Sequence, residues 1–229
     1  MRGRLLLAAL AASLVAAGGV LAAPPEDRLV SPDQHSSEKA RSLAAKYLNA
    51  LRELNAGIYH CVPWVEIGRE SIGFFRPKHL PGDDRYLSLR IFVEQDPSPQ
   101  FAALRFEERA ASMFSRYVGG MLRRMAAHAA MLTDPAVDGF TVIVGWLKPT
   151  AQAGAQPVHE TIAVFLPRPV AADYLAGRAK IHDVAARGQV FGYDGATPLG
   201  QLRLQAWEDS FLSTYRMANY QPDPGVTCR

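Results

Sequence analysis

Cysteine is scarce in this chain, whose 229 residues contain only Cys61 and Cys228. Metal-binding patterns are also lacking, since the six histidines form no HExxH or HxH motif and no Cys/His cluster at ligand spacing. Neither GxGxxG nor the GxxxxGK loop that cradles phosphates occurs. These absences exclude the local motifs of metalloenzymes and nucleotide-binding proteins, so we expect no cofactor. A site assembled from distant residues stays open.

A long apolar run occurs once, at the N-terminus. Arg2 and Arg4 precede an almost unbroken apolar stretch at 5–20, and small residues follow in VLAAPP. This pattern is typical of a secretory signal peptide, and we expect cleavage after Ala22. The alternative is a retained anchor, although about 16 apolar residues are short for a membrane span. No cysteine stands at the cut, as a bacterial lipoprotein would require.

Neither sign of charge is in marked excess once this segment is removed. The full chain has 25 Lys and Arg against 22 Asp and Glu, and without Arg2 and Arg4 the basic count is 23. The near-neutral charge predicts no nucleic-acid partner. The signal peptide predicts a periplasmic or secreted protein. No later stretch is apolar enough to cross a bilayer, so we expect no integral membrane span after cleavage.

The two cysteines are most simply one disulfide, because an exported chain meets an oxidising compartment. The alternatives are two buried free thiols or a bridge between chains. A Cys61–Cys228 bridge would tie the C-terminus to the segment between the first helix and the first strand. In the chain-entropy model, closing so long a loop contributes up to roughly 5 kcal/mol.

The mature chain divides into a flexible leader (23–35), one globular domain (36–218) and a tethered tail (219–229). Hydrophobic periodicity predicts three helix–hairpin units and a last helix. The expected helices lie at 40–54, with Gly57 as a stop, and at 101–132, 169–177 and 206–217. The expected hairpins pair 62–75 with 86–94, 140–147 with 161–167, and 189–193 with 199–206 through an Asp194–Gly195 turn.

This order predicts an α+β fold with a mainly antiparallel sheet, built from successive helix–hairpin units with helices packed on it. The alternative is an α/β fold with a mixed sheet, because each long connection has room for a crossover. The strands at 140–147 and 161–167 are almost wholly apolar, which favours a central place with both faces covered. In the strand at 86–94, Arg90 and Phe92 share one face, whereas Leu89 and Ile91 share the other.

No catalytic constellation is visible in the sequence, and we assign no catalytic, cofactor or metal residue. Ser71 in GRESIG has the wrong spacing for a nucleophile elbow. Cys61 follows His60 directly, and on an extended chain their side chains would point to opposite faces. The remaining histidines and carboxylates are isolated candidates: His35, His79, His128, His159, His182, Asp83, Asp84, Glu160, Asp173, Asp183 and Asp194.

Three features are open to both a structural interpretation and a binding role. The loop Arg76–His79, with Arg85, forms a small basic tip that is either solvated or in contact with a phosphate, glycan or acidic partner. Trp207, Phe211 and Tyr215 form an aromatic stripe that belongs to the core or to a docking surface. Phe114, Met121 and Met125 would line the pocket of a carrier for a small apolar ligand.

The sequence therefore leaves whether the protein is an enzyme undecided. We expect an exported protein with a binding or envelope-assembly role, whose partner is an envelope protein or a small apolar ligand. The alternatives are a carrier and an exported hydrolase with a His/carboxylate site assembled in space.

Overall fold

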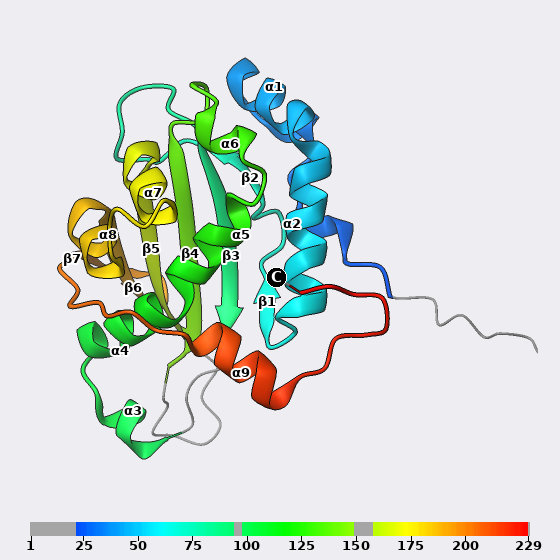
Figure 1. Cartoon of the computed structure of the whole chain (residues 1–229). Coiled ribbons are helices and arrows are strands. Elements are labelled where there is room, and N and C mark those ends of the chain that lie inside the picture. Colours follow the sequence, from blue (N-terminus) through cyan, green and yellow to red (C-terminus); the bar gives the residue numbers. More distant parts are fainter. Residues whose placement is uncertain (1–21, 94–97, 149–157, 229) are drawn as a thin grey trace, which may run out of the picture.

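A computed structural model describes residues 22–93, 98–148 and 158–228 of the chain (Figure 1). Its strands form one seven-stranded sheet in the order β1–β3–β4–β5–β6–β7, with β2 also paired to β3. The strands are β1 (Val65–Ile67), β2 (Gly73–Phe75), β3 (Tyr86–Val93), β4 (Gly139–Leu147), β5 (His159–Pro167), β6 (Gln189–Asp194) and β7 (Thr197–Leu202). All pairs are antiparallel except β3–β4, which is parallel. The expected α+β class and mainly antiparallel sheet are confirmed.

Helices precede, interrupt and follow the strands. The N-terminal ones are the short turns η1 (Glu26–Arg28) and η2 (Pro32–Gln34), then α1 (Glu38–Lys46) and α2 (Leu48–Cys61). The crossover from β3 to β4 carries α3 (Pro99–Ala103), α4 (Phe106–Met113), the π-helical turn η3 (Phe114–Val118), α5 (Gly119–Met125) and α6 (Ala130–Thr133). The C-terminal third adds α7 (Arg168–Leu175), α8 (Ile181–Arg187) and α9 (Phe211–Asn219).

The three expected hairpins are present. The first is split, because β1 and β2 both pair with β3, at opposite ends of that strand. The second joins β4 and β5 at the centre of the sheet, as expected. The third joins β6 to β7 through a turn at Gly195 and Ala196, directly after Asp194. Gly195 has a φ of +58°, which a glycine adopts without strain.

The core lies between one face of the sheet and the helices (Figure 1). Val142, Val144 and Trp146 of β4 point into this layer and are fully buried. Their neighbours in β4 point to the opposite face, where Ile143 is only half-buried. The expectation that both faces of β4 and β5 are covered was therefore wrong for part of the second face, which is hollowed and lined by side chains.

Three expected helices differ from those observed. The segment 101–132 is not one helix, because Leu104 and Arg105 are extended and η3 adds a π-turn before α5. The helix expected to stop at Gly57 continues to Cys61, where the chain turns toward β1. The sequence pattern also missed α8, whose seven residues are too few for a clear period.

The last helix begins at Phe211 rather than at residue 206. Trp207 lies outside it and is 45% exposed, so the aromatic stripe is shorter than expected. Phe211 and Tyr215 do stack, with ring centroids 5.2 Å apart. The fully packed residue of α9 is Leu212, which contacts α5 at Gly120.

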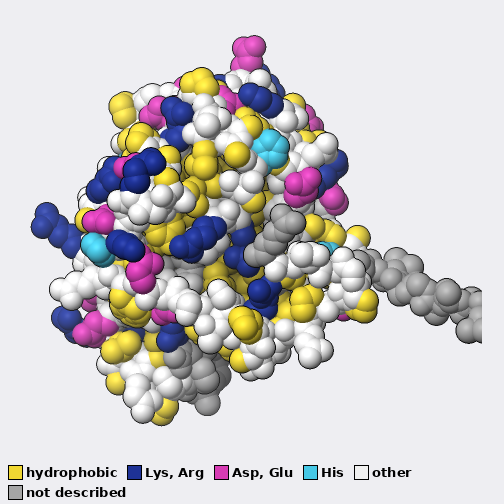
Figure 2. All heavy atoms as spheres, viewed as in Figure 1, with side chains coloured by type: hydrophobic (Ala, Val, Ile, Leu, Met, Phe, Trp, Pro, Cys, Tyr) yellow, Lys and Arg dark blue, Asp and Glu magenta, His cyan; other side chains and the backbone are white. Residues whose placement is uncertain are grey.

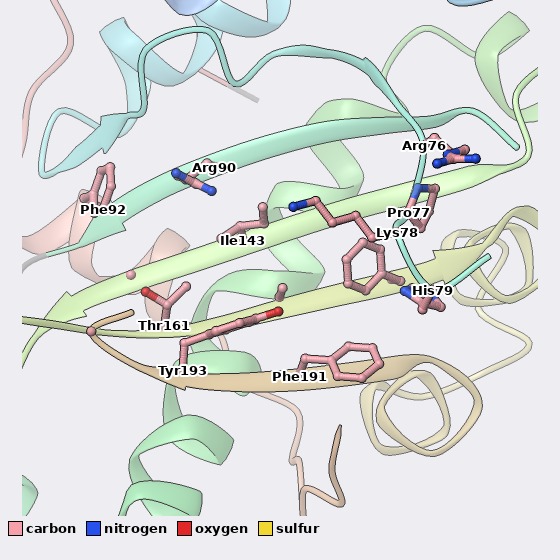
Figure 3. A pocket seen from close by; sticks show the side chains of 14 residues that line it. Arg76, Pro77, Lys78, His79, Arg90, Phe92, Ile143, Thr161, Phe191 and Tyr193 are labelled. Atoms are coloured by element: carbon pink, nitrogen blue, oxygen red, sulfur yellow. The ribbon is translucent and has the colours of Figure 1, made fainter. Parts of the chain in front are cut away.

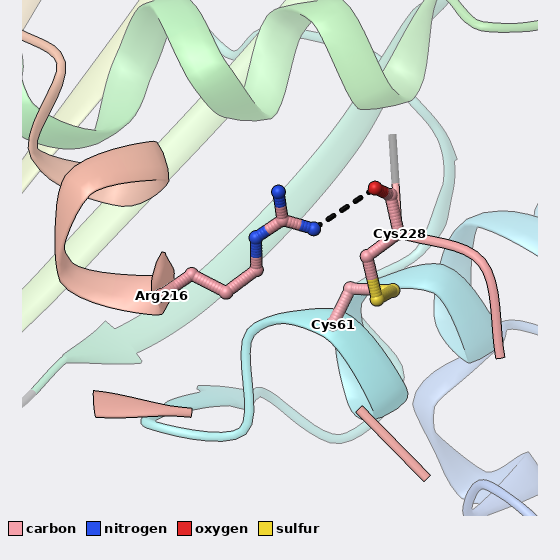
Figure 4. The surroundings of a disulfide bond; sticks show 3 residues. All are labelled: Cys61, Arg216 and Cys228. Atoms are coloured by element: carbon pink, nitrogen blue, oxygen red, sulfur yellow. Dashed lines mark hydrogen bonds between the residues drawn. A yellow bond between two sulfur atoms is a disulfide. The ribbon is translucent and has the colours of Figure 1, made fainter. Parts of the chain in front are cut away.

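Both ends of the described chain are attached to the domain. Leu29 and Val30 are buried and Leu29 pairs with Ile72, so part of segment 23–35 is docked although the sequence suggested flexibility. At the other end, the expected disulfide joins Cys61 to Cys228 (Figure 4). Residues 1–21 of the expected signal segment lie outside the described residues, as does most of the connection between the strands expected at 140–147 and 161–167.

Candidate functional site

A pocket of about 520 Å³ lies on the sheet face opposite the core, and we call it the open-face pocket (Figure 3). Two rows of side chains across β3, β4, β5 and β6 form its floor. One row is Arg90, Ile143, Ala163 and Phe191, and the next is Phe92, Gly145, Thr161 and Tyr193. Residues opposite each other in neighbouring strands share a face, so the register places both rows side by side.

The floor is hollow because three of its four central positions are small, the fourth being Ile143. Gly145, Thr161 and Ala163 occupy the two middle strands, whereas aromatic rings stand on the strands at either side. A Cβ at Gly145 would lie 2.9 Å from Cδ1 of Phe92, so a larger residue there would displace this ring. Figure 3 shows the Tyr193 ring lying across the sheet with its hydroxyl turned inward. The result is a shallow trough between rings.

The loop between β2 and β3 closes one end of this trough. Pro77 is buried, and the His79 ring packs on Phe165 at 4.7 Å and on Phe191 at 5.3 Å between centroids. Burial among these rings lowers the pKa of His79, which favours a neutral imidazole at pH 7. His79 therefore anchors the loop to the sheet.

Three cationic side chains line the open-face pocket: Arg76, Lys78 and Arg90. Lys78 reaches from the loop across the sheet toward Arg90, above Ile143 (Figure 3). The stem of Arg90 lies over Gly68, where a Cβ would be 3.2 Å from Cδ. Among the described residues no carboxylate lines the pocket and no ion pair engages these three cations. The pocket thus offers positive charge beside an apolar floor.

The reverse side of the same strands holds a buried ion pair. Glu160 of β5 is 2% exposed and accepts hydrogen bonds from Arg109 Nε at 2.8 Å and Nη2 at 2.5 Å. Trp146 Nε1 donates to the same carboxylate at 2.8 Å. Arg109 also donates to the carbonyl of Leu104, which holds the extended link before α4. The four groups satisfy one another inside the core, so we regard Glu160 as structural.

The sequence candidates for nucleophilic catalysis lie apart from the pocket. The buried hydroxyl of Ser71 donates to the carbonyl of Gly68 at 2.8 Å. Cys61 is bonded to Cys228, and the His60 ring packs edge-to-face against Tyr59, with centroids 5.0 Å apart. The expected extended backbone at these two residues was wrong, because both belong to the last turn of α2.

The histidines do not converge. His35 is buried beside Gly73 and Phe75, and burial, with repulsion from Arg85, lowers its pKa. His128 packs on Tyr47 and His159 on Phe92, while His182 lies beside Asp183 on α8. Within residues 22–93, 98–148 and 158–228, no three His, Cys, Asp or Glu side chains are arranged to hold a metal.

The other carboxylate candidates serve turns and ion pairs. Asp83 pairs with Arg85 in the β2–β3 loop, where Asp84 lies beside Gly82. Asp173 accepts from Arg178 and Arg187, and Asp183 accepts from the backbone N–H of Lys180. Lys148 donates to Asp194 at 2.6 Å next to the β6–β7 turn.

The proposed apolar carrier pocket is not formed by its expected residues. Phe114, Met121 and Met125 are packed in the core. Met125 alone of the three reaches a smaller hollow of about 270 Å³ beside Cys61. No helix in the described part of the chain is long and apolar enough to span a membrane.

Sequence reasoning found the basic loop of the open-face pocket but missed its floor. The alternation in β3 had already placed Arg90 and Phe92 on one face. The order of the strands was not known, so Gly145, Thr161 and Tyr193 could not be placed beside them. The missed signal was the small size of three outward-facing residues, Gly145, Thr161 and Ala163, in two strands whose other residues are mostly large and apolar.

No family model, curated protein or solved structure matches the chain. The case for a function therefore depends on the geometry of the sites.

Proposed function

We propose that this is an exported binding protein whose open-face pocket takes a small anion with a flat apolar body. The observation that carries this proposal is the small-residue trough of Gly145, Thr161 and Ala163 between rings, with Lys78 and Arg90 above it. A flat ring system would cover the trough, and its anionic group would reach the two cations. Apolar pockets with a few convergent polar groups are the usual form of small-molecule sites.

Binding is favoured over catalysis because the pocket supplies recognition groups but lacks a reactive pair. His79 is the one histidine in the lining, and its ring is held by Phe165 and Phe191. General acid–base chemistry needs a titrating group aimed at the substrate together with a partner that orients it. Export is a further part of the proposal, supported by the N-terminal apolar segment and by the Cys61–Cys228 disulfide.

Isothermal titration with a matched ligand pair tests this proposal on the chain from residue 23 onward. Naphthoate carries the flat body and the charge, whereas naphthalenemethanol carries the flat body alone. We expect naphthoate to bind about tenfold more tightly, a difference of roughly 1.4 kcal/mol. Arg90→Met keeps an aliphatic stem and removes one of the two charges, so it should reduce this preference without preventing binding of the neutral compound.

Gly145→Val tests the trough itself, because the new side chain fills the floor and displaces Phe92. Both compounds should then lose affinity together. Arg178→Met removes an exposed arginine from the α7–α8 turn and serves as the control, with binding unchanged. If naphthoate fails to bind, or binds the Gly145→Val and Arg90→Met variants as it binds the parent, the assignment of this pocket is rejected.

A further inference from the structure

A second hollow, of about 310 Å³, lies in the helical layer between α5 and the beginning of α9, and we call it the α5–α9 hollow. Its lining includes Arg123 and Arg124 of α5 together with Ser210, Ser213 and Arg216 of the α9 segment. A fourth arginine in the lining, Arg116 of η3, lies over the Phe211 ring, 5.1 Å from its centroid. Basic side chains gather over α5 and α9 in the middle of the view in Figure 2. This hollow shares no lining residue with the open-face pocket.

Neutral groups hold the guanidinium groups of Arg123, Arg124 and Arg216 in place. Arg123 lies over the Tyr174 ring, 4.9 Å from its centroid. Arg124 donates to the carbonyl of Gly120 at 3.3 Å, and Arg216 donates to the carbonyl of Cys228 at 2.9 Å (Figure 4). Among the described residues, none of these arginines forms an ion pair with a carboxylate.

The one carboxylate in the lining is already engaged. Asp209 accepts from the backbone N–H of Phe211 at 2.7 Å and from the Trp207 indole at 3.2 Å. Burial, with repulsion from Arg216 and Arg123, lowers the pKa of Arg124. Three like charges are therefore held near one another, an arrangement that costs free energy unless an anion enters.

The fold creates this cluster through a close helix contact. The π-turn η3 leads directly into Gly119 and Gly120, and a Cβ at Gly120 would overlap Leu212 of α9. The missing side chain lets α9 lie against α5 and brings Arg216 toward Arg124. π-turns inside helices occur frequently at functional sites.

We propose that the α5–α9 hollow binds a phosphate group. Guanidinium groups donate paired N–H bonds that match phosphate oxygens, and several of them share its charge. Ser210 and Ser213 add hydroxyl donors at the same place. The phosphate belongs either to a free anion or to a lipid headgroup. Trp207, just before α9, and Met217, within α9, are exposed apolar side chains, so binding to lipid vesicles is tested separately.

The first arm measures inorganic phosphate binding by isothermal titration and by thermal shift. We expect phosphate to raise the melting temperature more than sodium chloride of equal ionic strength does. Arg123→Gln combined with Arg124→Gln should weaken phosphate binding at least tenfold. Without phosphate the same variant should melt at or above the temperature of the parent chain, because repulsion within the cluster is relieved. Arg178→Gln is the matched control and should behave like the parent.

The second arm measures co-sedimentation with vesicles of phosphatidylglycerol or of phosphatidylcholine. Binding to the anionic vesicles that the double substitution removes would identify a headgroup as the source. Binding of free phosphate without vesicle binding would identify a soluble anion. The proposal is overturned if neither occurs, if the double variant binds as the parent does, or if chloride reproduces the thermal shift. Arg90→Met leaves this site intact, so its result separates this proposal from that for the open-face pocket.

Discussion

Removing the disulfide tests how the C-terminal segment contributes to stability. Cys61 and Cys228 are 167 residues apart in sequence, and they close almost the whole described domain into one loop. The chain-entropy model assigns about 5 kcal/mol to a loop of this length, because the cross-link restricts the unfolded chain. The paired Cys61→Ser and Cys228→Ser substitutions avoid leaving a free thiol that could form dimers.

The structure indicates that the observed loss will be smaller. Leu212 is the buried residue of α9, and the tail from Tyr220 to Cys228 is exposed or half-buried. Without the bridge, this segment can detach while the sheet stays folded, and the native ensemble regains part of the entropy. We expect a loss of about 2–4 kcal/mol and a melting temperature lower by about 5–15 °C.

Thermal unfolding and hydrogen exchange together measure both parts of this prediction. Amides of Phe211–Asn219 should exchange faster in the double variant, whereas those of β4 and β5 should stay protected. An unchanged melting temperature would show that the bridge adds nothing to stability. Equal loss of protection in α9 and β4 would show that the tail is integral to the domain, which would refute the fraying argument.

Three further changes have defined outcomes. Glu160→Ala leaves the buried Arg109 without its carboxylate and should cost about 3–5 kcal/mol in urea unfolding, while Leu at both positions should recover most of this loss. The side-chain hydrogen bond from Lys46 is the main interaction that lowers the pKa of Asp134, to about 2. Asp134→Asn should therefore lower the melting temperature at pH 7, and the gap to the parent should close as the pH falls from about 4 to 2. Gly120→Val should displace α9, seen as loss of its exchange protection, with the sheet amides unaffected.

Local patterns were sufficient for the units of this fold but not for their arrangement. Alternation in 86–94, the apolar pair 140–147 and 161–167, and the Asp194–Gly195 turn each predicted a hairpin that the structure contains. These signals arise from neighbours in sequence or across a short turn. The parallel pairing of β3 with β4 depends on packing of the whole crossover against the sheet, and no local period reports it.

The prediction of one long helix at 101–132 was wrong for a related reason. The apolar stripe predicts a continuous helix through 101–132, although Gly119 and Gly120 weaken its middle by about 1 kcal/mol each relative to Ala. Tertiary contacts decide the outcome, since Arg109 holds the carbonyl of Leu104 where the chain is extended before α4. Gly119 and Gly120 allow close packing against Tyr174 and Leu212.

The two sides of β4 explain why the candidate site escaped a reading based on hydrophobicity. Trp146 points into the core and binds the carboxylate of Glu160, whereas its neighbour Gly145 points into the trough. The strand is almost wholly apolar, so the sequence predicted that other elements would cover both of its faces. Size, rather than polarity, distinguishes them, because the core face carries large side chains, whereas three of the four central positions on the outward face of β4 and β5 are small. A gap left by small residues is filled in a packed interior, but on this face it stays available to a ligand.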